Sequence, residues 1–135
     1  MRVLDANFLI DYLNGHPAAE TYYESNGGDT NLWMMPAPAY AEAIVGVGNL
    51  PSGDVEEAID ALSWGEVYEI NRDLSVEAGR IADEVGPQEP SLDAVDALIA
   101  AVGRKLDAPV VSTDGDLTHE KTKQAIEVEE YRQDR

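Results

Sequence analysis

Apolar positions along the chain follow two patterns, short continuous runs and longer stretches with helical spacing. The short runs are typical of buried strands and fall at residues 1–4, 31–35, 66–70, 109–112 and 126–128. Helices are expected between them at residues 8–13, 18–25, 38–47, 55–62 and 116–122. Strands that alternate with helices predict an α/β fold, in which helices cover both faces of a parallel sheet.

Polar and turn residues predict where two further helices begin and end. We expect Asp73 to cap a helix that runs to residue 85 and stops before a Gly-Pro pair. We expect Ser91 to cap a second helix over residues 92–106. Residues 129–135 are expected to form a solvated, frayed tail. The length of 135 residues indicates a single domain, residues 1–135.

The charge balance of the chain is strongly acidic, with 27 Asp and Glu against 9 Lys and Arg and a net charge of -18. This excludes a basic domain that neutralises nucleic-acid phosphates with its own side chains. A site that meets phosphates through bound metal ions stays open. Because molar salt screens self-repulsion, we interpret the acidity as adaptation to a salt-rich (halophilic) source. An acidic protein of ordinary salt tolerance is the alternative.

Other residue types narrow the chemistry and the location. The chain has no cysteine, which excludes disulfides, thiolate zinc sites and cysteine nucleophiles. Its two histidines, His16 and His119, are too few for a histidine metal cage. No apolar run approaches the ~20 residues of a membrane span, and the N-terminus lacks a signal-peptide cleavage site. We therefore expect a cytoplasmic protein that does not bind membranes.

A few carboxylates stand among apolar neighbours, unlike the many acids expected at the surface. These are Asp5, Glu42, Asp96, Asp114 and Asp116. An unpaired buried carboxylate is costly, so it must be protonated, paired with a cation or bound to a metal. Nine basic residues are too few to pair with every acid, and Mg²⁺ and Mn²⁺ prefer oxygen ligands. The pattern therefore favours a shared divalent cation.

Each of these acids also has an ordinary structural alternative. Asp5 can cap the helix that follows it, and Glu42 can lie on an exposed stripe of its helix. Asp114 and Asp116 can be plain turn residues. Asp93 shares a helix face with Asp96, but its position favours a first-turn acid that interacts with the helix dipole.

Four segments, in order, resemble the motifs of PIN-domain nucleases. They are residues 4–13 (LDANFLIDYL), 40–46 (YAEAIVG), 96–101 (DALIAA) and 110–117 (VVSTDGDL). The third is the most specific, and the spacing follows the family over nearly the whole chain. The length is similar to that of VapC-type toxins of toxin–antitoxin pairs. The fourth motif departs from the family, with Ser112 where threonine is usual, Gly115 where a larger residue is usual and Leu117 where phenylalanine is common.

The resemblance implies a PIN-like fold with a five-stranded parallel sheet in the order 3-2-1-4-5. It implies that Asp5, Glu42, Asp96 and Asp114 form an acidic quartet that holds Mg²⁺ or Mn²⁺. Because of the departures in the fourth motif, Asp116 is an alternative fourth ligand. Strands 1 and 4 are neighbours at the point where strand order reverses, so Asp5 and Asp114 are expected in one crevice.

Further positions take their roles from the same resemblance. Asn7 and Ser112 match the polar positions that support the ligands. Arg104 and Lys105 are the nearest candidates for contact with the RNA backbone. The implied activity is metal-dependent hydrolysis of RNA phosphodiester bonds, by the toxin of a toxin–antitoxin pair. The implied partners are RNA, a cognate antitoxin and a second copy in a homodimer.

Other functions stay open at this point. A housekeeping PIN-domain nuclease that processes RNA and a non-catalytic PIN-like interaction module share the same motifs. A haloacid-dehalogenase-like phosphatase also places an aspartate after the first strand, but it requires Asp-x-Asp and a pocket lysine. This chain has Asn7 at the second position and no lysine before Lys105. RNA cleavage and phosphatase assays separate the two enzyme classes, and metal binding separates an enzyme from a module.

Overall fold

The computed structural model describes residues 1–132, which form an α/β fold around one five-stranded sheet. All strand pairs are parallel and the order is β3-β2-β1-β4-β5, which confirms the predicted topology. The strands are β1 (Arg2–Leu4), β2 (Trp33–Pro36), β3 (Glu66–Tyr68), β4 (Val110–Ser112) and β5 (Val128–Glu130). In the central strand, Val3 pairs with Met34 of β2 and with Val110 of β4.

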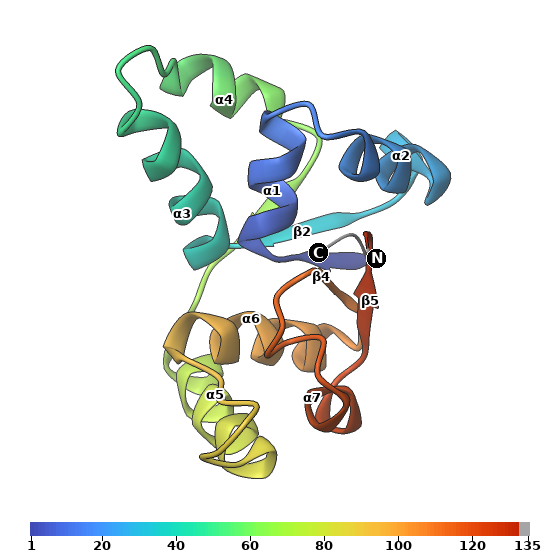
Figure 1. Ribbon diagram of the computed structural model, residues 1–135, viewed down its shortest axis with the longest axis vertical. Coiled ribbons are helices and arrows are strands. Elements are labelled where there is room, and N and C mark those ends of the chain that lie inside the picture. Colours follow the sequence, from blue (N-terminus) through green and yellow to red (C-terminus); the bar gives the residue numbers. More distant parts are fainter. Residues whose placement is uncertain (133–135) are drawn as a thin grey trace.

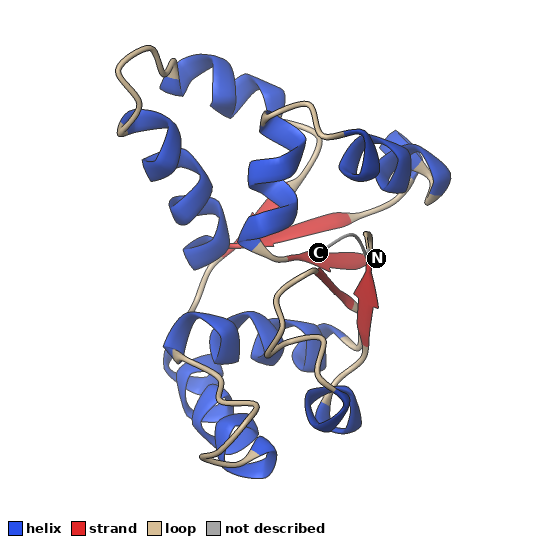
Figure 2. Ribbon diagram, in the orientation of Figure 1, coloured by secondary structure: helices blue, strands red, loops and turns tan. Residues whose placement is uncertain are grey.

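Helices cover both faces of the sheet, as the alternating pattern predicts (Figure 1). They are α1 (Ala6–Leu13), α2 (Pro17–Ser25), α3 (Ala37–Gly48), α4 (Val55–Ala61), α5 (Arg72–Val85), α6 (Ala94–Leu106) and α7 (Glu120–Ala125). The first four lie on one side of the sheet and the last three on the other (Figures 1 and 2). Within residues 1–132, no helix combines the length and the apolar character that a membrane crossing requires.

The strands are short, but the two helical layers bury the centre of the sheet and so stabilise it. Val3 and Leu4 of β1 and Val110 and Val111 of β4 have no exposed surface. Such continuous apolar runs are typical of strands in parallel sheets covered on both faces. The core therefore lies along the centre of the sheet, and the ends of β1 and β4 are held in fixed relative positions.

Two helices begin at residues other than those predicted, because a different side chain caps each one. Asn71, not Asp73, caps α5, where its Oδ1 accepts a hydrogen bond of 2.9 Å from the Leu74 backbone N–H. Asp93, not Ser91, caps α6, and its Oδ1 accepts a 2.8 Å bond from the Asp96 N–H. Each carboxamide or carboxylate lies three residues before the N–H it bonds, which is the geometry an N-cap requires.

The predicted helix at residues 116–122 is displaced to Glu120–Ala125. A tight turn precedes it, in which Asp114 Oδ1 accepts hydrogen bonds from the N–H groups of Asp116 (2.9 Å) and Leu117 (3.0 Å). These bonds satisfy backbone donors that would otherwise begin a helix. The sequence prediction failed here because the turn geometry depends on this one carboxylate.

The prediction of a frayed tail is wrong for residues 129–132. Strand β5 includes Glu129 and Glu130, two residues beyond the predicted strand. Tyr131 is buried, and its hydroxyl donates a 2.5 Å hydrogen bond to Asp11 Oδ2 on α1. Residues 133–135, where the same prediction applied, lie outside the described part of the chain.

Candidate metal centre

Asp5 lies at the point where β1 ends and α1 begins. Its Oδ1 accepts a 2.7 Å hydrogen bond from the Ala6 N–H, so the carboxylate caps α1. Its Oδ2 accepts a 2.6 Å bond from the Ser112 hydroxyl at the end of β4. Asp5 is 5% exposed. Each carboxylate oxygen keeps a lone pair beyond these bonds. Asp5 can therefore cap α1 and still act as a ligand in the site.

Ser112 ties the two central strands together at their carboxyl ends. It is fully buried, and the hydroxyl that donates to Asp5 also accepts a 2.9 Å hydrogen bond from the Asp114 N–H. The loop that carries Asp114 therefore begins at a fixed distance from Asp5. This is the point where the strand order reverses, at which the sequence predicts a crevice.

Three carboxylates converge beside this crevice. Asp96, Asp114 and Asp116 each offer one oxygen, and these oxygens lie within 4.8 Å of one another. Asp96 is in the first turn of α6, and its N–H is held by Asp93. Asp114 and Asp116 belong to the turn after β4. The structure thus brings Asp116 in beside Asp114, and the two positions that the sequence offered as alternatives lie together.

Burial and mutual repulsion raise the pKa values of Asp96, in this cluster, and of the neighbouring Asp5. The pKa of Asp96 is raised to about 7, first by burial and then by the charges of Asp114, Asp93, Asp5 and Asp116. The pKa of Asp5 is raised to about 6 by burial, although its hydrogen bonds to Ser112 and Ala6 act in the opposite direction. Both carboxyls therefore hold their protons more tightly than a solvated aspartate does.

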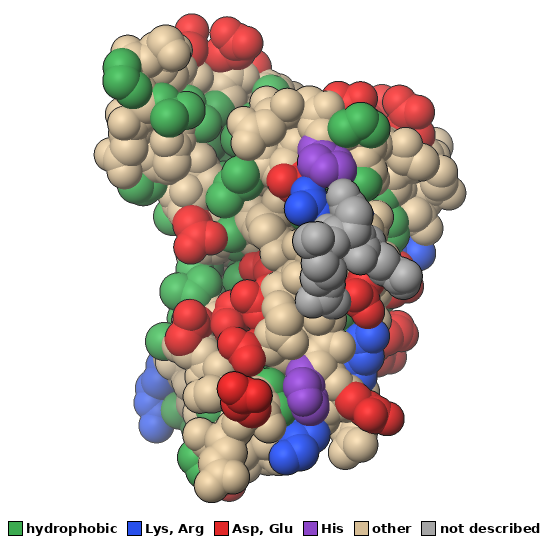
Figure 3. Space-filling view, viewed as in Figure 1, with side chains coloured by type: hydrophobic (Ala, Val, Ile, Leu, Met, Phe, Trp, Pro, Cys, Tyr) green, Lys and Arg blue, Asp and Glu red, His purple; other side chains and the backbone are tan. Residues whose placement is uncertain are grey.

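Glu42 lies apart from these three acids. It is exposed on α3, in the other helical layer, and it is not one of the three carboxylates that meet within 4.8 Å. Its charge still contributes to the raised pKa of Asp5. Acidic side chains gather along the narrow middle of the face in Figure 3, between the ends of α3 and α6. Glu42 is therefore close enough to influence Asp5 but is not one of the converging carboxylates.

Asn7 supports the site indirectly. Its Nδ2 donates a 2.9 Å hydrogen bond to Thr113 Oγ1, in the loop between Ser112 and Asp114. Its Oδ1 is buried and has no hydrogen-bond partner among residues 1–132. A buried acceptor without a partner costs free energy, so this atom offers a position for a water molecule or another donor.

Arg104 and Lys105 are not brought to the acidic cluster. They lie in the last turn of α6, whereas Asp96 is in its first turn. The Arg104 guanidinium forms ion pairs with Glu77 (2.8 Å) and Glu84 (2.6 Å). The structure therefore gives Arg104 a role in joining α5 to α6, and leaves the acidic cluster without a nearby arginine from this helix.

The donor set fits a divalent cation. No Lys, Arg or His of residues 1–132 forms an ion pair with the carboxylates of Asp5, Asp96, Asp114 or Asp116. All the converging ligand atoms are carboxylate oxygens, which suit Mg²⁺ or Mn²⁺ rather than a soft metal. A cation at this position would relieve the repulsion that raises the pKa values of Asp5 and Asp96.

Comparisons with known proteins agree with this fold. The sequence profile of the PIN domain matches residues 2–123. Comparison with curated protein sequences found no significant match. Similar solved structures include the VapBC2 complex of Rickettsia felis bound to a promoter DNA fragment, with a TM-score of 0.79 and 19% identity over 96% of this chain and 97% of that chain.

Two more solved structures are similar at comparable identity. A toxin–antitoxin complex from Klebsiella pneumoniae has a TM-score of 0.75 and 19% identity, over 89% of this chain and 92% of that chain. The sarcin-ricin loop cleaving toxin VapC20 of Mycobacterium tuberculosis has a TM-score of 0.67 and 21% identity, over 87% and 93%. At these identities the likeness establishes the shared fold.

Proposed function

Because this chain belongs to the PIN domain family, we propose that it is a metal-dependent ribonuclease that hydrolyses RNA phosphodiester bonds. The observation that carries the proposal is the convergence of Asp96, Asp114 and Asp116 within 4.8 Å, with no cationic side chain of residues 1–132 paired to them. Structural similarity to a toxin that cleaves the sarcin-ricin loop supports RNA as the substrate.

Asp96, Asp114 and Asp116 would hold Mg²⁺ or Mn²⁺, with Asp5 beside them. When bound, such an ion supplies the positive charge that orients the scissile phosphate and lowers the pKa of a water molecule. Ser112 fixes Asp5 and the start of the Asp114 loop through its two hydrogen bonds. Asp114 in turn positions Asp116, because its Oδ1 accepts a hydrogen bond from the Asp116 N–H. The chain's contribution is therefore a rigid arrangement of oxygens, set before the ion binds.

Glu42 is a fifth carboxylate of the proposed site, added to the three that converge and to Asp5, and it comes from the other helical layer. Its exposure leaves the carboxylate free to reach the ion directly or through water. Its effect on the pKa of Asp5 shows that the two charges act on each other. We expect Glu42 to contribute less to metal affinity than Asp96, because exposed carboxylates are well solvated and less fixed in position.

Two of the similar structures, the Rickettsia felis VapBC2 complex and the Klebsiella pneumoniae toxin–antitoxin complex, support a role as the toxin of a toxin–antitoxin pair. A toxin of this kind needs surfaces for an antitoxin and for the second copy in a homodimer. Large apolar side chains are exposed on α3, on α4 and in the loop between them, at Val45 (58%), Leu50 (57%) and Ile59 (39%). We expect these side chains to take part in such a surface, because exposed apolar patches are typical of protein interfaces. Size-exclusion chromatography with light scattering in molar KCl measures whether the chain forms a dimer.

The central experiment measures metal binding and RNA cleavage in the same proteins. Mn²⁺ is titrated by calorimetry in molar KCl into the wild type, Asp96→Asn and Asp60→Asn, an exposed control on α4. We expect metal-dependent cleavage in the wild type and the control, and a rate lower by about 100-fold or more in Asp96→Asn. Equal cleavage by wild type and Asp96→Asn contradicts the assignment. Absence of Mn²⁺ binding in the wild type favours an interaction module instead.

The toxin role has its own test. Induced expression of the wild type should arrest growth of the host cell, whereas Asp96→Asn should be tolerated at the same protein level. An active ribonuclease that leaves growth unchanged would favour a housekeeping role in RNA processing.

A further inference from the structure

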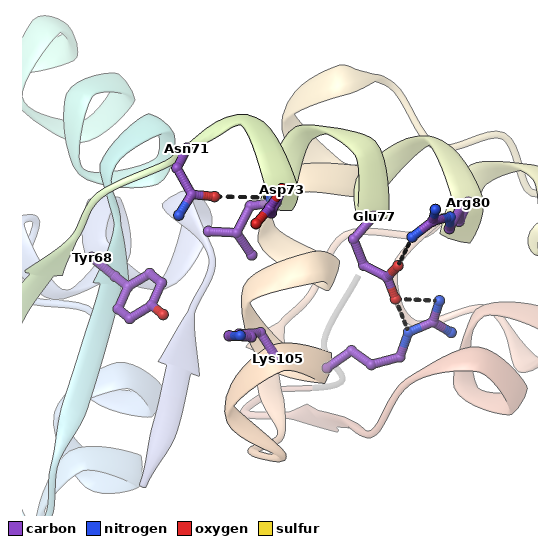
Figure 4. Close-up of a pocket in the computed structure, with 8 residues that line it drawn as sticks. Tyr68, Asn71, Asp73, Glu77, Arg80 and Lys105 are labelled. Carbon is purple, nitrogen blue, oxygen red and sulfur yellow. Dashed lines mark hydrogen bonds and ion pairs between the residues drawn. The ribbon is translucent and has the colours of Figure 1, made fainter.

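A second polar pocket lies away from the acidic cluster, between the end of β3, the start of α5 and the end of α6 (Figure 4). Its volume is about 290 Å³. This is near the lower limit for pockets that bind small molecules. Its walls carry a charge balance unlike that of the whole protein. They contain Arg80, Arg104 and Lys105 against two acids, whereas the chain has 9 basic and 27 acidic residues.

Arg104 is held at this pocket by Glu77 and Glu84, and Arg80 makes a looser contact with Glu77. Arg104 bonds to Glu77 and Glu84 through its Nε and both terminal nitrogens, so its donors are largely used. Arg80 makes a longer contact of 3.5 Å with Glu77 and is 70% exposed. The ion pairs of Arg104 hold this side of the pocket in place. Arg80 keeps guanidinium N–H donors that its single contact with Glu77 does not use.

Three other donors converge on the near side of the pocket. Figure 4 shows the Lys105 ammonium and the Asn71 amide nitrogen directed toward Tyr68, whose hydroxyl points into the same space. Asn71 uses its Oδ1 to cap α5, which turns its Nδ2 toward the pocket. None of these three donor groups has a hydrogen-bond or ion-pair partner in the described part of the chain.

From this arrangement we propose that the pocket of Tyr68, Asn71 and Lys105 is a second binding site, for a phosphate group of an RNA strand or of a free nucleotide. Three uncommitted donors from three separate elements, one of them cationic, match the several acceptor oxygens of a phosphate. Lys105 is a cation that no carboxylate of residues 1–132 pairs with, in a protein whose acids greatly outnumber its bases. That the phosphate belongs to an RNA strand rests on the proposed function. That the pocket binds a phosphate group does not.

The site would hold a part of the RNA remote from the bond that is cut. Lys105 lies nine residues beyond Asp96 on α6, so the two are separated along the helix axis by about 13 Å. A phosphate bound at Lys105 therefore belongs to a different nucleotide from the one at the acidic cluster. This would explain how a chain of charge -18 retains a polyanion.

The test is an NMR titration of the ¹⁵N-labelled full chain with inorganic phosphate, AMP and a short single-stranded RNA. EDTA prevents metal-dependent cleavage, and the KCl concentration is the lowest at which the wild type melts cooperatively. We expect saturable amide shifts at Tyr68, Asn71 and Lys105. Lys105→Gln should weaken binding about tenfold or more, as expected for loss of a charged hydrogen bond. Lys121→Gln, an exposed lysine on α7 with the same change of charge, should not.

Two outcomes identify the source of the phosphate. If RNA binds well above AMP, and Lys105→Gln raises KM for RNA cleavage without lowering kcat, the source is the substrate strand. If AMP binds as well as RNA, the source is a free nucleotide. Tyr68→Phe, which keeps the ring and removes only the hydroxyl, should weaken binding by a smaller factor than Lys105→Gln in either case.

The proposal is overturned if no probe shifts these residues, or if Lys105→Gln and Lys121→Gln weaken binding equally. Its failure is separable from that of the proposed nuclease. If the protein binds phosphate at Lys105 but cleaves no RNA, the binding site is supported and the proposed nuclease activity is refuted. If it cleaves RNA but binds no phosphate at Lys105, only the proposed binding site is refuted.

Discussion

The Ser112 hydroxyl lies 2.6 Å from Asp5 Oδ2, although 107 positions separate the two residues in the sequence. Both residues are buried, and the same hydroxyl accepts a hydrogen bond from the Asp114 N–H. One small side chain thus fixes the first acid of the site and the loop that carries two more. Because the bond lies in the protein interior, no solvent can replace it without rearrangement.

Ser112→Ala should therefore weaken Mn²⁺ binding by about 10- to 100-fold, the range found for residues that orient metal ligands. The fold should persist, since alanine fits the same space. Calorimetry with Mn²⁺ measures the effect, with Ser52→Ala, an exposed turn residue, as the control. Unchanged affinity in Ser112→Ala would show that the Asp5 geometry does not depend on this bond.

Metal affinity should rise with pH through the pKa values of Asp5, about 6, and Asp96, about 7. Protons compete with the cation for these carboxylates, so affinity should be low at pH about 5 and level off above pH about 8. Mn²⁺ titrations across this range measure the dependence. In Asp96→Asn the upper part of the rise should be lost. A profile that is flat over this range would contradict the raised pKa values.

The metal-free protein should show the opposite trend in stability. Both folded-state pKa values lie above those of the unfolded chain, so the folded state binds more protons between pH about 4 and about 7. The contribution of these groups is fully present below the unfolded pKa and is lost as the pH rises through about 7. Thermal melts with EDTA should therefore show that Asp96→Asn raises Tm at pH about 8 and has little effect at pH about 4. An equal effect at both pH values would argue against this linkage.

Salt should stabilise the chain if the acidic surface reflects adaptation to a salt-rich source. The Tm should rise from low to molar KCl, because salt at that concentration reduces the Debye length to about 3 Å. Glu24→Gln removes one exposed charge at the C-terminal end of α2, so it should raise Tm at low salt and have little effect in molar KCl. A Tm that does not respond to KCl would refute the interpretation.

Tyr131→Phe should destabilise the fold by about 1 to 2 kcal/mol, because it leaves a partly buried Asp11 with one donor fewer. The ring contact with Phe8, 4.8 Å between centroids, would remain. Denaturant unfolding measures the change. Tyr23→Phe removes the same hydroxyl from an exposed bond to Asp29 and should cost less than about 0.5 kcal/mol. Equal losses would mean that burial of the Tyr131 bond is unimportant.

The alternation of apolar runs with helical stretches was enough to predict a parallel sheet covered by helices, because strands buried on both faces must be continuous apolar runs and parallel strands require helical crossovers. The order of the strands was implied by the resemblance to PIN-domain nucleases. The sequence also placed Asp5 and Asp114 just after two of the apolar strands, and the resemblance made those two strands neighbours. Helix boundaries were less certain from sequence, since Asn71 and Asp73, or Ser91 and Asp93, are both acceptable caps within two residues of each other.

Which of the acids meet could not be predicted before the elements were placed in three dimensions. Asp116 joins Asp96 because the carboxylate of Asp114 closes a tight turn, and Arg104 is held by Glu77 and Glu84 at the far end of α6. A sequence lists the charged groups, but their pairing depends on distances of a few ångströms between elements far apart in the chain. For the same reason the ordered Tyr131 and the pocket at Lys105 could be recognised only after α1, α5 and α6 were placed against the sheet.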